Sequence, residues 1–274
     1  MYNNVLAAVN EFTNSEVAAA FAVTFSRVCG ARLVLYYADE GKGTDAASHA
    51  EAALERLFAH AVDEGIDVER VVEKGSPFDK IPQQVSANGI DILFMATRHE
   101  DASRRLFVKT LPRELMLSLP CSVALARIVK FGIPAPRHIL APVRGFLSDV
   151  DKRAFFLAAL ARGYGSKLTL FNMQKPLLSF FHGEINLAPA QREKRLPQDV
   201  RAYITAVEAQ GVRPLVRTAH GAGRWSIVTE SALHRNDLIV MGASQRGLLG
   251  EIASGSPVEQ TLRDTICNMI VFRP

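Results

Sequence analysis

The sequence contains few of the residues that mark disulfide-bonded or metal-binding proteins. Its 274 residues include three cysteines and one tryptophan. Cys29, Cys121 and Cys267 form no CxxC pair, which argues against a zinc site and is typical of a reducing compartment. The seven histidines show no HExxH or comparable metal spacing. We therefore expect three reduced cysteines that behave as small buried hydrophobic residues, and no dedicated metal site.

Long apolar runs and targeting patterns are also absent. No run approaches the roughly 18–20 residues that span a membrane, and the opening MYNNVLAAVNEF lacks the basic segment of a secretory signal. Hydrophobic residues make up 48% of the chain, which is enough for a core and too many for disorder. No basic run is interleaved with aromatic residues. These absences predict a cytoplasmic protein that binds neither membranes nor nucleic acid.

Charge is unevenly distributed along the chain. Residues 1–135 carry 14 basic and 17 acidic side chains, whereas residues 136–274 carry 18 and 11. The second half is therefore better suited to an anion, although a chance distribution of solvated charges gives the same counts.

Three segments of the first half recur, in the same order, in the second half. The pairs are Val5–Asn10 with Ile139–Arg144, Gly30–Tyr36 with Gly165–Phe171, and Asp91–Thr97 with Asp237–Ala243. A collinear repeat of this kind indicates a tandem duplication. The Gly/Pro connector at 131–137 separates the copies, so we predict one domain over residues 1–133 and a second over residues 134–274.

Each copy alternates predicted strands with helical segments. Strands are expected at 4–9, 31–38, 67–73, 90–96 and 121–127, and at 137–143, 166–173, 213–218, 236–241 and 267–272. Continuous apolar runs such as Ile92–Met95 are typical of strands buried on both faces. The pattern predicts an α/β fold: two tandem, doubly wound, parallel five-stranded sheets with helices on both faces. Ligands of such folds lie at the carboxyl ends of the strands.

A glycine-rich loop follows the fourth strand of the second copy. It begins at Gly242 and ends in Gly255-Ser256-Pro257. Ser256 and Glu259 form a capping box, and Pro257 suits the first helical position, so a helix is expected to begin at Ser256. A helix N-terminus attracts phosphate. Capping boxes also begin many helices that bind nothing, so both interpretations stay open here.

This loop resembles the signature of the universal stress protein family, Gly-x2-Gly-x9-Gly-Ser/Thr. Gly242 matches the first glycine, Gln245 occupies the position of the second, and Gly255 and Ser256 match the final pair. The resemblance covers nearly the whole chain. It implies two Rossmann-like domains of the adenine nucleotide alpha-hydrolase-like type, packed as an intramolecular pseudo-dimer.

The resemblance also implies a ligand. An adenine nucleotide such as ATP or AMP, with or without Mg²⁺, would lie across the first and fourth strands of the second domain. The implied contacts are Pro142, Val143, Arg144, Met173, Gly242, Gln245, Gly255, Ser256 and Pro257. Three of them depart from the family pattern: Gln245 replaces a glycine, Arg144 an aspartate, and Pro257 lacks a backbone N–H.

The function implied is a cytosolic stress-response or regulatory role without enzymatic turnover, since no positioned general base is evident. Two alternatives stand beside it: an interaction module in which both sites are silent, and a slow ATP hydrolase. The protein partner and a homodimer are left open. The insertion at 175–198 is either a lid or a subunit contact.

The first copy departs further from the signature. Ala96-Thr-Arg-His99 replaces Gly-x2-Gly, Lys109-Thr110 replaces Gly-Ser, and Asn10 takes the aspartate position. We interpret the first domain as a degenerate copy that packs against the second. Thr110 is expected to cap the helix that follows it.

Overall fold

The computed structural model describes residues 1–97, 110–131, 135–143, 148–174, 196–220, 227–243 and 257–274. The first domain comprises β1 (Asn4–Val9), α1 (Thr13–Cys29), β2 (Arg32–Asp39), α2 (Thr44–Asp63), β3 (Val68–Lys74), α3 (Pro77–Ala87), β4 (Ile92–Ala96), α4 (Leu111–Ser118) and β5 (Ser122–Arg127). The second comprises β6 (His138–Val143), α5 (Val150–Tyr164), β7 (Lys167–Gln174), α7 (Gln198–Ala209), β8 (Leu215–His220), α8 (Ile227–Leu233), β9 (Leu238–Gly242), α10 (Pro257–Asp264) and β10 (Asn268–Arg273). All ten predicted strands are present.

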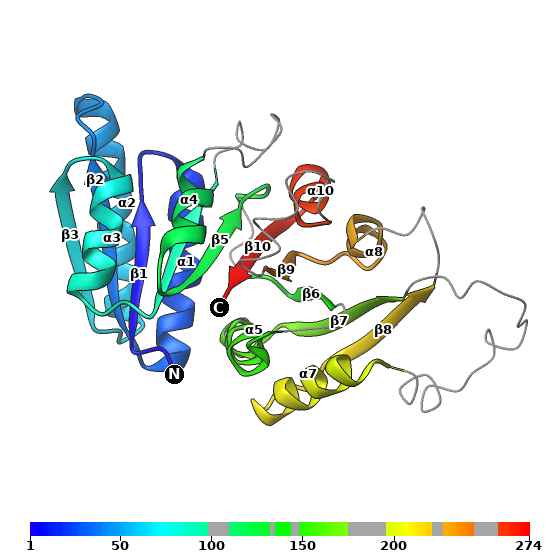
Figure 1. Cartoon of the computed structure of the whole chain (residues 1–274). Helices are drawn as coiled ribbons and strands as arrows, with labels where there is room; N and C mark the ends of the chain where they lie inside the picture. The colour runs from blue at the N-terminus through cyan, green and yellow to red at the C-terminus, as the bar shows by residue number, and fades with distance from the viewer. Residues whose placement is uncertain (98–109, 132–134, 144–147, 175–195, 221–226, 244–256) are drawn as a thin grey trace, which may run out of the picture.

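The strands form one ten-stranded sheet that runs through both domains, in the order β3-β2-β1-β4-β5-β10-β9-β6-β7-β8 (Figure 1). Every pairing within a domain is parallel, as predicted. The domains join through β5 and β10, which pair antiparallel from Met269–Arg127 to Arg273–Val123. The sequence predicted two five-stranded sheets. It did not predict that they join edge to edge, because the strand pattern does not reveal which edges meet.

Helices cover both faces of the sheet and bury two apolar cores. On one face, α1, α2, α5 and α7 pack over side chains such as Leu33 and Leu170. On the other, α3, α4, α8 and α10 pack over Val34 and Phe171. Neighbouring strand residues thus serve opposite cores, since successive side chains point to opposite faces. This explains the continuous apolar runs in the strands.

An aromatic cluster makes the first core continuous between the domains. The Phe25 ring on α1 lies 5.5 Å from Phe94 on β4 and 5.4 Å from Phe156 on α5. Phe156 stacks on Phe272 of β10 at 4.0 Å. Aromatic pairs in such arrangements contribute about 0.5–1.5 kcal/mol beyond area burial. The two domains are therefore one packed unit, an intramolecular pseudo-dimer.

Several local predictions can be compared with the structure. Helix α10 begins at Pro257, next to the predicted start, and Leu262 and Val258 pack in the second core. All three cysteines are free thiols. Cys121 and Cys267 are buried as predicted, whereas Cys29 is only partly buried. Burial raises the pKa of the Cys29 and Cys121 thiols to about 11.

Candidate functional site

The candidate site of each domain lies where its central parallel strands end. In the second domain, β6 ends at Val143 beside Asn172 of β7, and Gly242 ends the adjacent strand β9. Since these strands are parallel, their carboxyl ends lie at one edge of the sheet. We call this the carboxyl edge, and the opposite one the amino edge.

The predicted contacts of the second domain fall partly within the described residues. Val143 is buried, Pro142 half-buried, and the backbone of Met173 pairs with Ala219 on β8. Pro257 is the first residue of α10. Gly242 is the last residue of β9. The remaining contacts lie outside the described residues: Arg144, Gln245, Gly255 and Ser256. So do His99 and Lys109 of the first copy and most of the insertion 175–198.

A buried arginine that the sequence patterns did not single out lies against Gly242. A Cβ placed on Gly242 would lie 2.1 Å from Nη1 of Arg153, so a larger residue there would require the guanidinium to shift. Arg153 comes from the first turn of α5 and is 6% exposed. Its Nε donates to Ser148 O at 2.7 Å, and its Nη2 to Ala243 O at 2.7 Å. Gly242 therefore has a packing role in addition to its predicted ligand role.

The charge of Arg153 is incompletely compensated. Among the described residues, its hydrogen-bond acceptors are carbonyls, and the nearby carboxylate of Asp149 attracts the guanidinium without forming an ion pair within 4.0 Å. Burial lowers its pKa from the ordinary value, because desolvation disfavours the charged form. Arginine nevertheless stays protonated at neutral pH. A desolvated cation beside the strand ends is a local attraction for an anion.

A second unsatisfied donor lies on β7. Asn172 is 3% exposed, and its side-chain Nδ2 has no hydrogen-bond partner among the described residues. A buried polar group without a partner costs about 1–3 kcal/mol, so it invites an explanation. It lies next to Met173, one of the nucleotide contacts that the resemblance implies.

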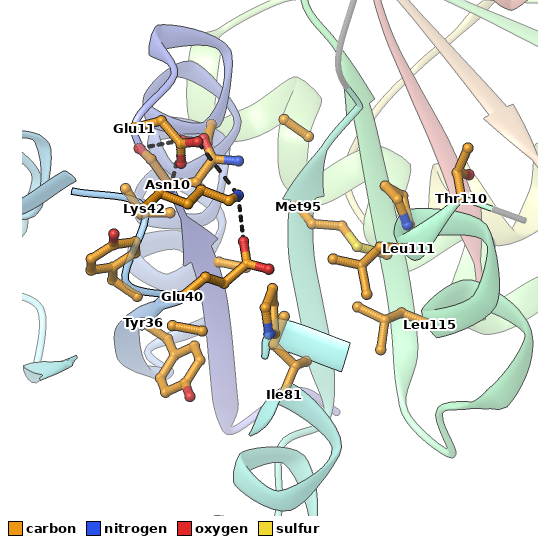
Figure 2. Close-up of a pocket in the computed structure, with 18 residues that line it drawn as sticks. Asn10, Glu11, Tyr36, Glu40, Lys42, Ile81, Met95, Thr110, Leu111 and Leu115 are labelled. Atoms are coloured by element: carbon orange, nitrogen blue, oxygen red, sulfur yellow. Dashed lines mark hydrogen bonds and ion pairs between the residues drawn. The ribbon is translucent and has the colours of Figure 1, made fainter. Parts of the chain in front are cut away.

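The first domain has a cavity of about 420 Å³ at its own carboxyl edge. Figure 2 shows Tyr36, Met95 and Leu115 among its lining, with Thr110 at the start of α4. Pockets for small molecules typically measure about 300–1,000 Å³. A cavity in the copy interpreted as degenerate was not expected from its motif, since cavity volume is set by side chains from several elements.

The polar part of this cavity is acidic, with one paired lysine. Lys42 Nζ lies 3.7 Å from Glu11 Oε1 and also forms an ion pair with Glu40 (Figure 2). The Tyr36 hydroxyl donates to Glu73 at 2.8 Å, and burial, with this neighbour, raises the pKa of the phenol. Two carboxylates near the mouth repel a phosphate. The cavity therefore favours a ligand without net negative charge.

Asn10 and Thr110, two residues at motif positions of the first copy, both lie shortly before a helix. Asn10 Oδ1 accepts a hydrogen bond from Phe12 N at 3.0 Å, so the side chain shapes the β1–α1 turn. Thr110 is the N-cap residue of α4 in extended conformation, as predicted, but its side chain makes no capping hydrogen bond. The expected hydroxyl cap is therefore not formed.

Comparisons with known proteins agree with this architecture. The model of the universal stress protein family matches residues 1–127 and 136–273. The chain belongs to the universal stress protein family. A search of curated protein sequences finds no match.

Solved structures related to this universal stress protein cover its whole length. A universal stress protein from Archaeoglobus fulgidus DSM 4304 superposes with TM-score 0.63 at 14% identity, over 99% of this chain and 98% of that one. A functionally unknown protein from Pseudomonas aeruginosa PAO1 gives 0.64 at 16%, over 100% and 93%. The cytoplasmic domain of a prokaryotic cation chloride cotransporter gives 0.59 at 11%, over 99% and 95%. At these identities the likeness shows the shared fold.

None of the helices in the described residues is both long and apolar enough to cross a membrane. Within the same part of the chain, no group of three or more His, Cys, Asp and Glu side chains is arranged to hold a metal ion.

Proposed function

We propose that this universal stress protein is a cytosolic regulatory protein that binds an adenine nucleotide at the carboxyl edge of its second domain. The observation that carries the proposal is the buried guanidinium of Arg153 over Gly242. Taking a cation out of water is costly unless an opposite charge compensates it. A phosphate at the strand ends would supply that charge. The predicted N-terminus of α10 adds a favourable dipole there.

Among the described residues, no arginine side chain occupies the equivalent place beside Thr97 in the first domain. There Asn14, in the first turn of α1, donates through Nδ2 to Thr97 O, as Arg153 does to Ala243 O. Thr97 and Ala243 correspond, since their amides donate to Ala126 O and Phe272 O at the same strand position. A neutral amide thus stands in for the guanidinium. This difference favours the second domain as the host of an anionic ligand.

We propose that the nucleotide is bound and not turned over. An enzyme needs a general base within about 2.6–3.2 Å of the proton that it removes. The described residues at the second carboxyl edge provide arginine, amide and apolar groups, and their carboxylate, Asp149, lies beside the Arg153 cation. Binding without turnover suits a sensor, whose output is a change in what the protein contacts.

The test is nucleotide affinity in variants of Arg153. Calorimetric titration with ATP, ADP and AMP should show near one site per chain in the unchanged protein. Arg153→Met should weaken binding by about tenfold or more, because a charge-assisted hydrogen bond contributes about 1.5–3 kcal/mol. Arg153→Lys should lose less, since it keeps the charge and loses the planar fork. Circular dichroism and thermal unfolding establish that each variant is folded.

A matched control lies in the first domain. Ala96→Leu narrows the cavity there, since Ala96 lines it, and should leave nucleotide affinity unchanged. If Ala96→Leu weakened binding and Arg153→Met did not, the site would lie in the first domain. That result would favour a second candidate function, binding of an uncharged nucleoside-like molecule in the 420 Å³ cavity. Absence of nucleotide in the purified protein, with no heat on titration, would contradict the proposal and favour the interaction module.

A further inference from the structure

The second domain has another cavity, at its amino edge. It measures about 640 Å³ and spans the starts of β6, β7 and β8. We call it the amino-edge groove and define it by its basic lining: His138, Arg162, Lys167, Arg213, Arg217 and His234. Among the described residues that line it, none is an aspartate or a glutamate. A cleft lined by one sign of charge focuses the field and concentrates counter-ions.

One side of the groove is held in place by a buried carboxylate. Glu230 on α8 is 3% exposed, and its Oε1 lies 3.9 Å from Arg217 Nη1 and 3.3 Å from His234 Nε2. Arg217 Nη1 and His234 Nε2 are 2.7 Å apart, so the guanidinium donates to the imidazole nitrogen. Because His234 Nε2 accepts this hydrogen bond, it carries no proton in this arrangement, and Arg217 is the positioned donor, which loses less entropy on binding.

His138 Nδ1 lies 3.8 Å from Asp237 Oδ2, but the remaining three basic residues of the groove have no such partner among the described residues. Among the described residues, no carboxylate lies within 4.0 Å of Arg162, Lys167 or Arg213. These side chains are exposed at the α5–β7 and α7–β8 turns. Like charges gathered in one groove repel one another, and a bound anion would relieve that repulsion.

The first domain is an internal reference, because the duplication supplies the same turns with different charges. There, Arg27 Nε pairs with Glu64 Oε2 at 3.1 Å, and Arg32 pairs with Glu69. Arg162 and Lys167 correspond to Arg27 and Arg32, each 135 residues further on. The basic residues are therefore present in both copies.

The acidic residues are present in only one copy. Strand register aligns the second copy with the first: Thr169 pairs with Leu215 where Val34 pairs with Glu69. By the same spacing the acidic residues Glu64, Asp67 and Glu69 of the first domain are replaced by Gln210, Arg213 and Leu215. The second domain has thus kept the cations, lost the carboxylates that pair with them, and gained an arginine. A chance excess of solvated charge does not by itself place these changes around one cavity.

We propose that the amino-edge groove binds a small anion carrying two or more phosphate groups. Several cations spread along one cavity match a ligand with several separated charges. The guanidinium forks of Arg213 and Arg217 suit phosphate oxygens. This site lies at the opposite edge of the sheet from the proposed nucleotide site and does not depend on it.

The test uses tripolyphosphate as the probe, titrated calorimetrically into the full chain and into the Arg153→Met variant. Both should bind it saturably at the groove, with affinity that falls as salt rises. Arg213→Asp with Leu215→Glu, which installs the residues of the first domain, should weaken this binding by about tenfold or more. The matched control is Arg201→Asp, an exposed position in the first turn of α7, which should change affinity by no more than about twofold.

Four results would overturn the proposal. The first is that the unchanged chain does not bind tripolyphosphate, and the second is that the groove variant and the Arg201→Asp control lose the same amount of affinity. The third is that only Arg153→Met weakens tripolyphosphate binding. The fourth is that the groove residues bind an RNA oligonucleotide but not tripolyphosphate. Loss only with Arg153→Met would place the anion at the carboxyl edge and leave the proposed nucleotide site standing. The two proposals therefore fail separately.

Discussion

Single residues decide what the second carboxyl edge can hold. Gly242 was predicted as a point of close approach to a phosphate, and the group that approaches it in the structure is Arg153. The glycine was predictable because it follows an apolar strand. The arginine was not, because in sequence it is one polar residue in a helix 89 positions away, and nothing local shows where its side chain reaches.

The contact between Gly242 and Arg153 predicts a non-additive pair of substitutions. Gly242→Ala should lower the free energy of unfolding by about 1–3 kcal/mol, because the added Cβ displaces a guanidinium that is hydrogen-bonded to Ala243 O. In an Arg153→Met background the same change should cost much less. Urea unfolding of the four proteins measures this coupling. Strictly additive costs would mean that the two side chains do not meet.

Elements were predictable to the extent that their pattern is local. The strand expected at 4–9 is β1 without change, and the strand expected at 90–96 is β4 at Ile92–Ala96. The pairing of β5 with β10 was not predictable, because the sequence of a strand buried on both faces does not depend on which strand lies beside it. Nor was the amino-edge groove, although the basic excess of the second half pointed to an anion.

The contact between helices α1 and α5 rests on a small residue. A Cβ on Gly163 would lie 2.5 Å from Thr24 Cγ2 and 3.1 Å from Val28 Cγ2. Gly163→Ala should therefore destabilise the protein by about 1–3 kcal/mol, despite the better helix propensity of alanine. Thr24→Ser removes the nearest methyl group and should recover most of this loss. Thermal unfolding of both variants tests it; an unaltered midpoint for Gly163→Ala would show that the helices can separate freely.

The whole molecule should lose stability in alkaline solution. Burial raises the pKa of Cys29 and Cys121 from 9.0 to about 11, and that of Tyr2 and Tyr164 from 10.0 to about 12. Above pH 9 the unfolded chain releases protons that the folded chain still holds, so the free energy of unfolding falls. The fall should run from about pH 9 to about pH 12.

Urea unfolding across this range measures the effect. Cys29→Ser with Cys121→Ser should make the decline between pH 9.0 and about 11 shallower, because serine does not titrate there. An equally steep decline in this variant would assign the effect to the tyrosines alone.

The order of the strands in space has a consequence for the order of assembly. Among the described strands, β10 is the last to be synthesised, yet it lies in the middle of the sheet between β5 and β9. Domains generally begin to fold while the chain is still being made. Until β10 emerges from the ribosome, β5 and β9 present open edges that can pair with other strands. The emergence of β10 is therefore the step that closes the sheet, and the stages before it are those that most need protection from aggregation.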